Sequence, residues 1–289
     1  MKEKVCLITG ATAGIGKETA IALAKMGAEI IFTSRNQQKG ELVKNEIIAI
    51  SNNTKVDFIL CDLSSLNSIK EFCVTFKKKY NRLHVLINNA GTSGFKRRLS
   101  KDGIEMTFAV NHLAPFLMTN LLLDVIKNSV PARIITVSAY LHKFGTIDYN
   151  DLEHKESYSI IKSYSQSKLA NILFTKQLAL ELKDQDVTVN CLLPERAVTN
   201  IVQDGGIVFN LLVRFLKSLN LKRLSAARAA LTPVYLATSK NVENITSECF
   251  KKNKIVQTSE ESYDRDNAKR LWEVSREYVK EYLSIQVFK

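Results

Sequence analysis

The first sixteen residues constrain the fold most strongly, because they place a short apolar run directly before a glycine-rich turn and a helical pattern. The run Val5-Cys-Leu-Ile8 leads into Thr9-Gly-Ala-Thr-Ala-Gly-Ile-Gly16. A buried strand, a glycine turn and a helix in this order form a unit that binds a dinucleotide, since the helix N-terminus attracts the pyrophosphate. In such a unit Gly10 permits the tight turn, Gly14 lets the backbone approach the pyrophosphate, and Gly16 lets the helix pack closely.

Strand-like and helix-like segments alternate through most of the remaining chain. Further apolar runs lie at residues 29–34, 55–61, 84–88, 133–137 and 187–193, and helical patterns separate them. Alternating strands and helices form right-handed crossover units and predict a parallel sheet. We therefore predict an α/β fold, with one Rossmann-type doubly wound domain over residues 1–289 and a terminal helix at about 262–287.

The end of the second strand bears on the choice of nucleotide. Arg35 follows this strand, and no acidic residue occupies the tip where a carboxylate would bind the ribose 2′-hydroxyl of NAD. Arg35 suits a 2′-phosphate, so the sequence favours NADP(H). Lys17, at the helix start, either adds positive potential nearby or is an ordinary surface residue. Asp62, after the third strand, either binds the adenine amino group or caps the next turn.

Tyr164 and Lys168 are four residues apart in a predicted helix, so their side chains share one face. A fixed cation stabilises a phenolate and lowers its pKa from the usual value of about 10. Such a pair can exchange a proton with a carbonyl oxygen, although the same spacing also arises by accident on exposed helices. Asn111 lies among apolar neighbours, where a buried amide needs partners, and Ser138 ends the fifth strand.

Together, Thr9-Gly-x-x-x-Gly-x-Gly16, Asp62, Asn88-Asn-Ala-Gly91, Asn111 and Tyr164-x-x-x-Lys168 resemble the short-chain dehydrogenase/reductase family over nearly the whole chain. Asn111 to Leu123, residues 138–152 with His142 and Gly145, and Ser167 to Asn171 look like its retinol-dehydrogenase branch. Members of that branch mostly prefer NADP(H), which agrees with the inference from Arg35.

The resemblance implies roles for individual residues. Tyr164 would be the acid/base, Lys168 would hold the nicotinamide ribose and lower the pKa of Tyr164, and Asn111 would anchor a water that links Lys168 to solvent. A serine, here Ser138, would orient the substrate carbonyl. The implied cofactor contacts are Gly10, Thr12, Gly14, Ile15, Gly16, Arg35, Asp62, Leu63, Asn88, Ala90, Gly91, Tyr164, Lys168, Pro194 and Thr199.

Three positions depart from the family. Ala139 stands where the branch has the second and active of two serines, and adjacent residues of an extended segment point to opposite faces, so Ser138 does not simply replace it. Glu195 follows Pro194 where the family has glycine beside the nicotinamide, and its carboxylate either repels the cofactor or points to solvent. Ser247 stands where the branch generally has glycine.

We therefore predict an NADP(H)-dependent oxidoreductase that interconverts an apolar aldehyde or ketone, retinoid-like or lipid-derived, and its alcohol. The alternative is a catalytically impaired cofactor-binding or regulatory member of the family, because of Ala139 and Glu195. An apolar segment interrupted by bases at about 200–225 predicts a lid over a hydrophobic substrate pocket, or contact with a membrane surface through 207–223.

The composition of the chain limits which classes of partner and which cellular location we predict. The formal net charge is +12, but the lysines are dispersed, so no nucleic-acid partner is predicted. The five cysteines form no Cys-x-x-Cys pair, which argues against a metal site and a disulfide framework. No apolar run is long enough to span a membrane, so we predict a cytoplasmic protein, with peripheral membrane contact as the alternative. The resemblance implies a homodimer.

Overall fold

The computed structural model describes residues 1–195, 202–203 and 226–283. Within these residues an eight-stranded sheet has the order β10-β9-β7-β6-β4-β1-β2-β3, and its neighbouring strands are parallel except for β9 and β10. The strands are β1 (Val5–Ile8), β2 (Glu29–Ser34), β3 (Val56–Leu60), β4 (Val85–Asn88), β6 (Ala132–Val137), β7 (Val187–Leu192), β9 (Cys249–Lys251) and β10 (Lys254–Ile255). The predicted α/β fold with a parallel sheet is confirmed.

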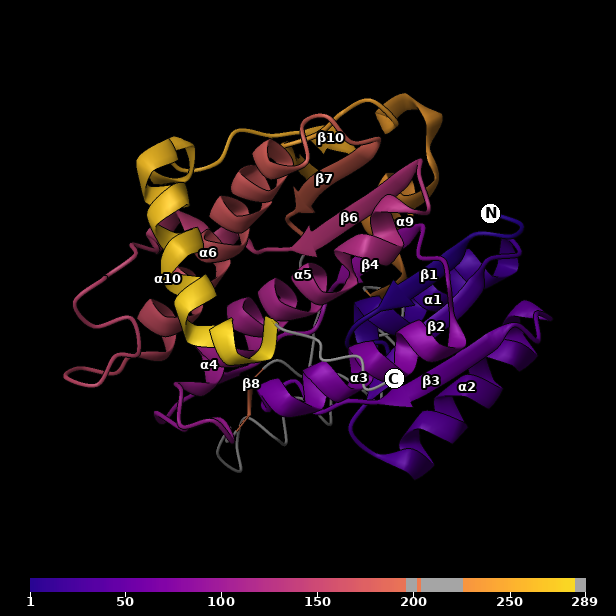
Figure 1. The fold of residues 1–289 in the computed structure, drawn as a ribbon, viewed down its shortest axis with the longest axis horizontal. Coiled ribbons are helices and arrows are strands. Elements are labelled where there is room, and N and C mark those ends of the chain that lie inside the picture. The colour runs from indigo at the N-terminus through magenta and orange to yellow at the C-terminus, as the bar shows by residue number, and fades with distance from the viewer. Residues whose placement is uncertain (196–201, 204–225, 284–289) are drawn as a thin grey trace.

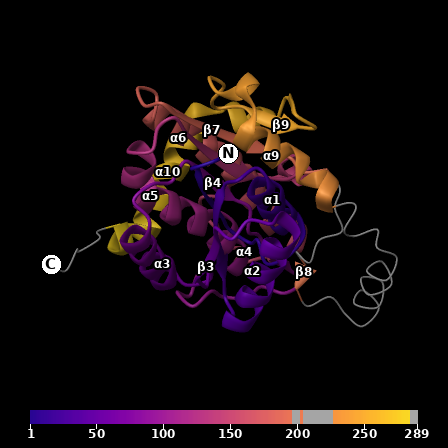
Figure 2. The same ribbon diagram turned by 90° about the vertical axis from the view of Figure 1, so that its right-hand side faces the viewer.

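Helices cover both faces of the sheet (Figures 1 and 2). On one face lie α1 (Gly14–Lys25), α2 (Gln37–Ser51) and α9 (Leu231–Thr238), and on the other lie α3 (Leu66–Lys79), α5 (Ala114–Lys127), α6 (Ile160–Glu181) and α10 (Arg265–Leu283). A strand covered on both faces is apolar along its whole length, and all four residues of β1 are buried. The central strands therefore read as continuous apolar runs.

The direction of the chain across the sheet creates the place for a ligand. From β1 the chain proceeds to β2 and β3 on one side, and then crosses to β4, β6 and β7 on the other. The segments that leave the carboxyl ends of β1 and β4 consequently diverge, and ligands of open parallel sheets bind in the crevice at this switch point. The glycine turn follows β1, and Asn88-Asn-Ala-Gly91 follows β4.

The apolar pattern of the sequence predicts one continuous helix from Ile104 to Ile126, and this prediction is wrong in its middle. The structure has α4 (Met106–Phe108), then a π-helical turn at Ala109–Leu113, then α5. Such π turns inside α-helices recur at functional sites, and this one carries Asn111. The prediction that no apolar run is long enough to span a membrane is wrong by length and composition, because the segment 106–127 passes both criteria, although 78% of its most apolar window is buried within the fold.

Helix α10 packs on the body through aromatic side chains. The Trp272 ring lies edge-on to Phe116 at 4.8 Å and stacks on Phe174 at 5.9 Å between ring centroids. His112 forms a 2.7 Å hydrogen bond with Ser275 of the same helix. Helix α10 thereby fastens α5 to α6, the two helices that flank the candidate site.

Several short elements were not predicted, because they are too short to show a hydrophobic period. Strands β9 and β10 extend the sheet beyond β7, and β5 (Ser93–Gly94) pairs with β8 (Val202–Gln203) next to the loop after β4. A 3-10 helix, η2, occupies Tyr140–Phe144. All five cysteines are buried and free, in agreement with the prediction of a chain without a disulfide framework.

Ser247 stands where the branch has glycine, and the structure gives it a backbone φ of 67°. Its N–H donates a 2.7 Å hydrogen bond to the carbonyl of Val189, which holds the segment in place. Left-handed geometry costs a non-glycine residue roughly 1–2 kcal/mol. The serine is therefore strained by the tertiary structure around it.

We expect Ser247→Gly to raise the free energy of unfolding by about 0.5–1 kcal/mol, because relief of left-handed strain outweighs the added freedom of glycine in the unfolded chain. Urea unfolding followed by circular dichroism measures the change. Ser247→Ala is the matched control and should give no such gain, since alanine is equally strained at this φ. Equal stabilisation by both variants would contradict the strain argument.

Candidate functional site

The glycine turn can exist only without side chains at two of its positions. Gly10 has a φ of 69°, and a Cβ added there would lie 2.8 Å from the Cα of Ala90. A Cβ added at Gly16 would lie 2.6 Å from the carbonyl oxygen of Gly10. The side-chain amide of Asn89 donates to the carbonyls of Thr9 and Gly10 at 2.8 and 3.3 Å. The turn is thus pinned against the loop that follows β4.

This geometry fits a dinucleotide. Helix α1 starts at Gly14, its first turn has no acidic residue, and Ala13 at the N-cap provides no side-chain hydrogen bond. Neither an acidic side chain nor a capping side chain therefore offsets the partial positive charge at the helix N-terminus, and this charge can attract a pyrophosphate. Ile15, within the same turn, is buried against Ala229 and Ala230.

The residues predicted to contact the nucleotide lie around this turn. Asn88 is buried at the end of β4 and donates to Thr119 at 3.0 Å, while the N–H of Ala90 donates to the hydroxyl of Thr9 at 3.0 Å. Thr12 lies in the turn itself, and Leu63 packs against the core after β3. The sequence motifs from β1, β3 and β4 therefore converge at one edge of the sheet.

The groups expected near the adenosine have distinct surroundings. Arg35 is exposed after β2, and Asn36 caps α2 by accepting a hydrogen bond from the N–H of Lys39. Lys17 is paired with Glu46 at 2.8 Å, so its charge is already partnered. Arg35 is consequently the better candidate for a 2′-phosphate.

Asp62 caps the turn that follows β3. Its carboxylate accepts hydrogen bonds from the N–H and hydroxyl of Ser64 and an ion pair from Lys101 at 2.9 Å. Desolvation by burial raises the pKa of Asp62, but the hydrogen bonds from Lys101 and Ser64 outweigh it and leave the pKa below its usual value. The turn-capping interpretation of Asp62 is thus the one the contacts support.

Tyr164 and Lys168 lie on α6 and are brought to the end of β6. Lys168 is 2% exposed, and its Nζ lies 3.2 Å from the carbonyl oxygen of Val137 and 5.4 Å from the centroid of the Tyr164 ring. A Cβ added at Gly91 would lie 3.4 Å from the same Nζ. The loop after β4 thus passes directly over the lysine. A loop that runs beside the flat nicotinamide ring needs a small residue such as Gly91 at this point.

Asn111 is fully buried at the π turn and satisfies its amide with two neighbours. Its Oδ1 accepts from the N–H of Thr92 at 2.7 Å, and its Nδ2 donates to the carbonyl of Thr92 at 3.0 Å and to Ser167 at 2.9 Å. Ser167 precedes Lys168 on α6. Asn111 therefore joins the loop after β4 to the helix that carries the tyrosine and lysine.

Burial sets the titration of the pair in the structure. Desolvation raises the pKa of Tyr164 to about 12 and lowers the pKa of Lys168 to about 8. The pKa of Tyr164 was predicted to be lowered by Lys168, but it is raised instead, because desolvation dominates it. Tyr164 is consequently a protonated phenol at neutral pH.

Ser138 points away from the place where a substrate carbonyl would lie. Its Oγ donates a 2.7 Å hydrogen bond to the backbone carbonyl of Lys168, and the residue is 1% exposed. Ala139 has extended geometry with φ −156° and ψ 160°, so its methyl group points to the other face. The serine braces α6, and the side chain on the opposite face offers no donor.

The segment after Ala139 is fixed by residues whose function the sequence did not reveal. His142 is fully buried, and its Nδ1 and Nε2 contact the carbonyl of Ala139 at 2.7 Å and the N–H of Ser259 at 3.2 Å. A Cβ added at Gly145 would lie 2.4 Å from the carbonyl oxygen of Ser165. Gly145 therefore allows this segment to touch α6 beside Tyr164.

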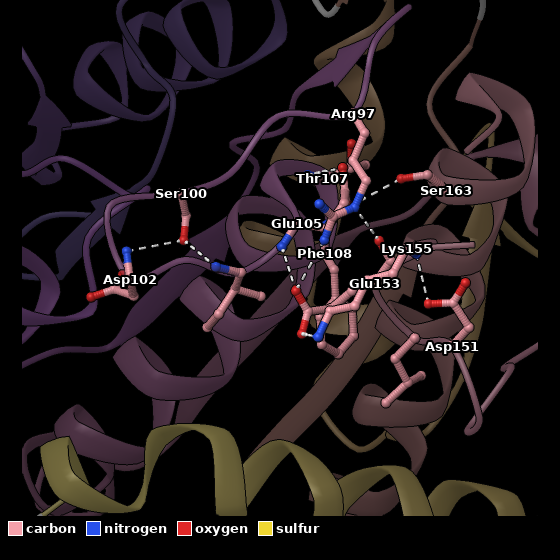
Figure 3. A network of polar contacts seen from close by, with 12 residues as sticks. Arg97, Ser100, Asp102, Glu105, Thr107, Phe108, Asp151, Glu153, Lys155 and Ser163 are labelled. Atoms are coloured by element: carbon pink, nitrogen blue, oxygen red, sulfur yellow. Dashed lines mark hydrogen bonds and ion pairs between the residues drawn. The ribbon is translucent and has the colours of Figure 1, made fainter. Parts of the chain in front are cut away.

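A buried carboxylate connects the two halves of the site (Figure 3). Glu105 is 1% exposed and accepts hydrogen bonds from the N–H groups of Thr107 and Phe108 at 2.9 and 2.7 Å, and from the Ser163 hydroxyl at 3.2 Å. It thereby caps the helix that leads to Asn111 and holds the residue that precedes Tyr164. Its only sequence signal was an acid at the start of an apolar helix.

Glu153 supports Glu105 from the polar loop before α6. Its carboxylate accepts a 3.1 Å hydrogen bond from the N–H of Glu105 and contacts Arg97 and Lys155 (Figure 3). It also accepts a 3.3 Å hydrogen bond from the hydroxyl of Tyr278. The Glu153 carboxylate is thus surrounded by two cations and two hydrogen-bond donors. The network ties α4, α6 and α10 into one rigid support.

Pro194 and Glu195 follow β7 at the same edge of the sheet. Glu195 does not point freely to solvent, because its Oε2 lies 3.0 Å from the Nε of Arg228. Thr199 and most of the predicted lid, including 207–223, lie outside the described residues. The described pair 202–203 joins β5 beside the loop after β4.

Comparison with known proteins agrees with this geometry. The family model described as short chain dehydrogenase matches residues 4–205. Retinol dehydrogenase 14 of Mus musculus is 38% identical, over 96% of this chain and 86% of that protein. Retinol dehydrogenase 13 of Homo sapiens is also 38% identical, over 96% of this chain and 84% of its own length.

Solved structures share the fold. A crystal structure of a putative uncharacterized protein from Mycobacterium paratuberculosis has a TM-score of 0.78 at 28% identity, covering 96% of this chain and 94% of that chain. The RhlG/NADP active-site complex of Pseudomonas aeruginosa has a TM-score of 0.66 at 21% identity, covering 86% of this chain and 94% of the other. The latter likeness concerns the fold alone.

The buried Lys168 predicts a pH dependence of stability. Because its pKa falls to about 8 on folding from an ordinary 10.5, the unfolded chain binds more protons between these values, and stability rises with pH there. We expect the free energy of unfolding of the wild type to gain about 2 kcal/mol over Lys168→Met between pH 7.5 and 10. Urea titrations at both pH values measure this, and parallel curves would contradict it.

Proposed function

This chain belongs to the short-chain dehydrogenase/reductase family, in its retinol-dehydrogenase-like branch, and we propose from that premise that it is an NADP(H)-dependent oxidoreductase of apolar aldehydes, ketones or alcohols. Membership sets the reaction class, which is carbonyl–alcohol oxidoreduction with a nicotinamide cofactor and a small-molecule substrate. The proposal adds the nucleotide, the acid and the class of substrate.

The observation that carries the proposal is the pair of the half-buried Tyr164 and the buried Lys168, beside Gly91 and Asn111. A bound NADPH supplies the hydride in the reductive direction. Tyr164, with a pKa of about 12, holds its proton at neutral pH and is placed on the same helix face as Lys168. Its phenol can therefore protonate the carbonyl oxygen as negative charge develops there.

Lys168 is the group that restores the proton. Its pKa of about 8 allows it to exchange a proton near neutral pH, which a fully hydrated lysine does far less readily. The ammonium also lowers the energy of a phenolate left on Tyr164, once the hydroxyl has given up its proton. Asn111 holds Ser167 and the loop over the lysine, and so fixes the geometry in which this exchange takes place.

NADP(H) is favoured over NAD(H) by the tip of β2. Arg35 is exposed there, and no acidic side chain follows β2 in the sequence where one would repel a 2′-phosphate. An arginine presents a planar set of donors that matches a phosphate. We take NADPH as the physiological reductant on this basis.

The substrate class is proposed from two supports. The similar proteins reported above are retinol dehydrogenases, which are named for an apolar alcohol. On α6, which carries Tyr164, Ile161 is exposed, and an exposed apolar side chain on this helix suits an apolar molecule. A retinoid-like or lipid-derived aldehyde is thus the first substrate to test.

The single domain, the cytoplasmic location and the homodimer stay predictions from the sequence.

A second candidate is a cofactor-binding or regulatory protein with slow catalysis. It is favoured by one specific contact, the hydrogen bond that Ser138 makes to the carbonyl of Lys168. With Ser138 engaged and Ala139 unable to donate, the carbonyl oxygen lacks the orienting hydroxyl that the family resemblance implies. The nicotinamide-binding side of the site is otherwise the same in both candidates.

We expect Tyr164→Phe to lower kcat for reduction of all-trans-retinal or a long-chain aldehyde by about 10²–10⁴-fold, the usual contribution of a positioned acid. NADPH oxidation measured by absorbance gives the rate, and NADH run in parallel tests the nucleotide preference. The Kd of NADPH should stay close to that of the wild type. A wild type that reduces no aldehyde, ketone or retinoid on a broad panel would sink the enzymatic proposal.

We expect Ala139→Ser to raise kcat by about a hundredfold, because one preorganised donor to the developing oxyanion contributes an effect of that size. Ser138→Ala is the matched control, and it should lower stability without raising kcat, since its hydroxyl bonds α6. Steady-state kinetics of the three proteins decide the matter. No increase in kcat for Ala139→Ser would show that another group already orients the carbonyl.

A further inference from the structure

We propose that Arg228 is a cofactor-binding residue, and that its guanidinium is paired with Glu195 until the dinucleotide binds. The Glu195–Arg228 ion pair opens when the dinucleotide binds, and the Arg228 guanidinium then contacts the diphosphate. The inference rests on the proposed function only in requiring a dinucleotide at the glycine turn. It does not depend on which substrate is reduced, or on whether catalysis is fast.

Arg228 is anchored beside the predicted diphosphate site. Ala229 and Ala230, the next two residues, are buried against Ile15 of the glycine turn. Helix α9, which begins at Leu231, lies next to α1 on the same face of the sheet (Figure 2). The backbone that directly follows Arg228 is therefore packed against the first turn of α1, at whose N-terminus a pyrophosphate binds.

Glu195 approaches the same place from the other side. It follows Pro194 at the carboxyl end of β7, and its Oε2 lies 3.0 Å from the Nε of Arg228. Ile15, Glu195 and Arg228 thus come from three separate stretches of chain and meet at the switch-point edge of the sheet. A carboxylate here would repel an anionic cofactor if it had no cation beside it.

The exposure of the Glu195–Arg228 ion pair allows Arg228 to exchange the carboxylate for a diphosphate. The Glu195 side chain is 22% exposed, whereas that of Arg228 is 67% exposed. Ion pairs this accessible contribute little to stability, so opening one is easy. A guanidinium carries five N–H donors, and its planar fork binds phosphate oxygens through parallel charge-assisted hydrogen bonds. A diphosphate is a stronger partner for Arg228 than one partly exposed carboxylate.

The exchange explains how this chain accommodates an acid where the family resemblance implies glycine. Before the cofactor binds, the ion pair is closed and Arg228 neutralises Glu195. Once the diphosphate binds, Arg228 contacts it. Glu195 competes with the diphosphate for Arg228, whereas a glycine at position 195 could not. Glu195 consequently weakens cofactor binding, and Arg228 strengthens it.

The test is the Kd of NADPH for four full-length proteins: the wild type, Glu195→Gln, Arg228→Ala and the double variant. Isothermal titration calorimetry without substrate measures binding independently of catalysis. We expect Glu195→Gln to bind more tightly than the wild type, and Arg228→Ala more weakly. In the Glu195→Gln background, Arg228→Ala should weaken binding by about tenfold, the effect of one lost charge-assisted hydrogen bond.

A second nucleotide identifies the contact. NADH shares the diphosphate but lacks the 2′-phosphate, so Arg228→Ala in the Glu195→Gln background should weaken NADH and NADPH binding by the same factor. Lys269→Ala, which removes an exposed cation from α10 on the opposite face, is the charge-matched control and should leave both Kd values unchanged. Thermal unfolding of each variant checks that the fold persists.

Two outcomes would overturn the proposal while leaving the proposed function intact. Equal Kd values for Glu195→Gln and the double variant would show that Arg228 does not touch the cofactor. A loss confined to NADPH would assign the contact to the 2′-phosphate instead of the diphosphate. Absence of NADPH and NADH binding in all four proteins would instead refute both this proposal and the nicotinamide cofactor on which the proposed function depends.

Discussion

The close approach of two loops at the switch point is the constraint on which the rest of the site depends. The Thr9 hydroxyl accepts hydrogen bonds from the N–H groups of Asn89 and Ala90, both at 3.0 Å, and neither Gly10 nor Gly16 leaves room for a Cβ. Gly91, in the second loop, lies against Lys168. The same contact that shapes a phosphate-binding turn therefore also places the loop above the candidate proton-transfer pair.

A reciprocal set of hydrogen bonds then fixes α6 on β6. The Lys168 ammonium contacts the carbonyl of Val137, and the Ser138 hydroxyl donates to the carbonyl of Lys168. Each side chain thus donates to a buried backbone carbonyl, Lys168 to that of Val137 and Ser138 to that of Lys168. A buried carbonyl without a partner would be destabilising. Ser138 holds the lysine in place for this reason, and the same engagement removes its hydroxyl from the substrate side.

The sequence predicted what depends on local pattern and order, and missed what depends on distant contacts. Alternating apolar runs and the glycine spacing were sufficient for the parallel sheet and for the place of the cofactor turn. The π turn at Asn111 is set by partners at Thr92 and Ser167, and Glu105 acquires its importance from Ser163, 58 residues away. The pKa of Tyr164 was predicted with the wrong sign, because the depth of burial is a property of the packed structure.

Two of the three departures from the family, Glu195 and Ala139, have different physical consequences. The carboxylate of Glu195 would act on the binding of an anionic cofactor, and the structure provides a cation, Arg228, at 3.0 Å to neutralise it. The missing hydroxyl at Ala139 would act on the transition state alone, and the neighbouring Ser138 is committed to α6. A chain that compensates the first change and not the second retains the requirements for holding a dinucleotide while losing one donor to the oxyanion. Both functional candidates therefore require a bound dinucleotide, and they differ in how far the missing donor slows turnover.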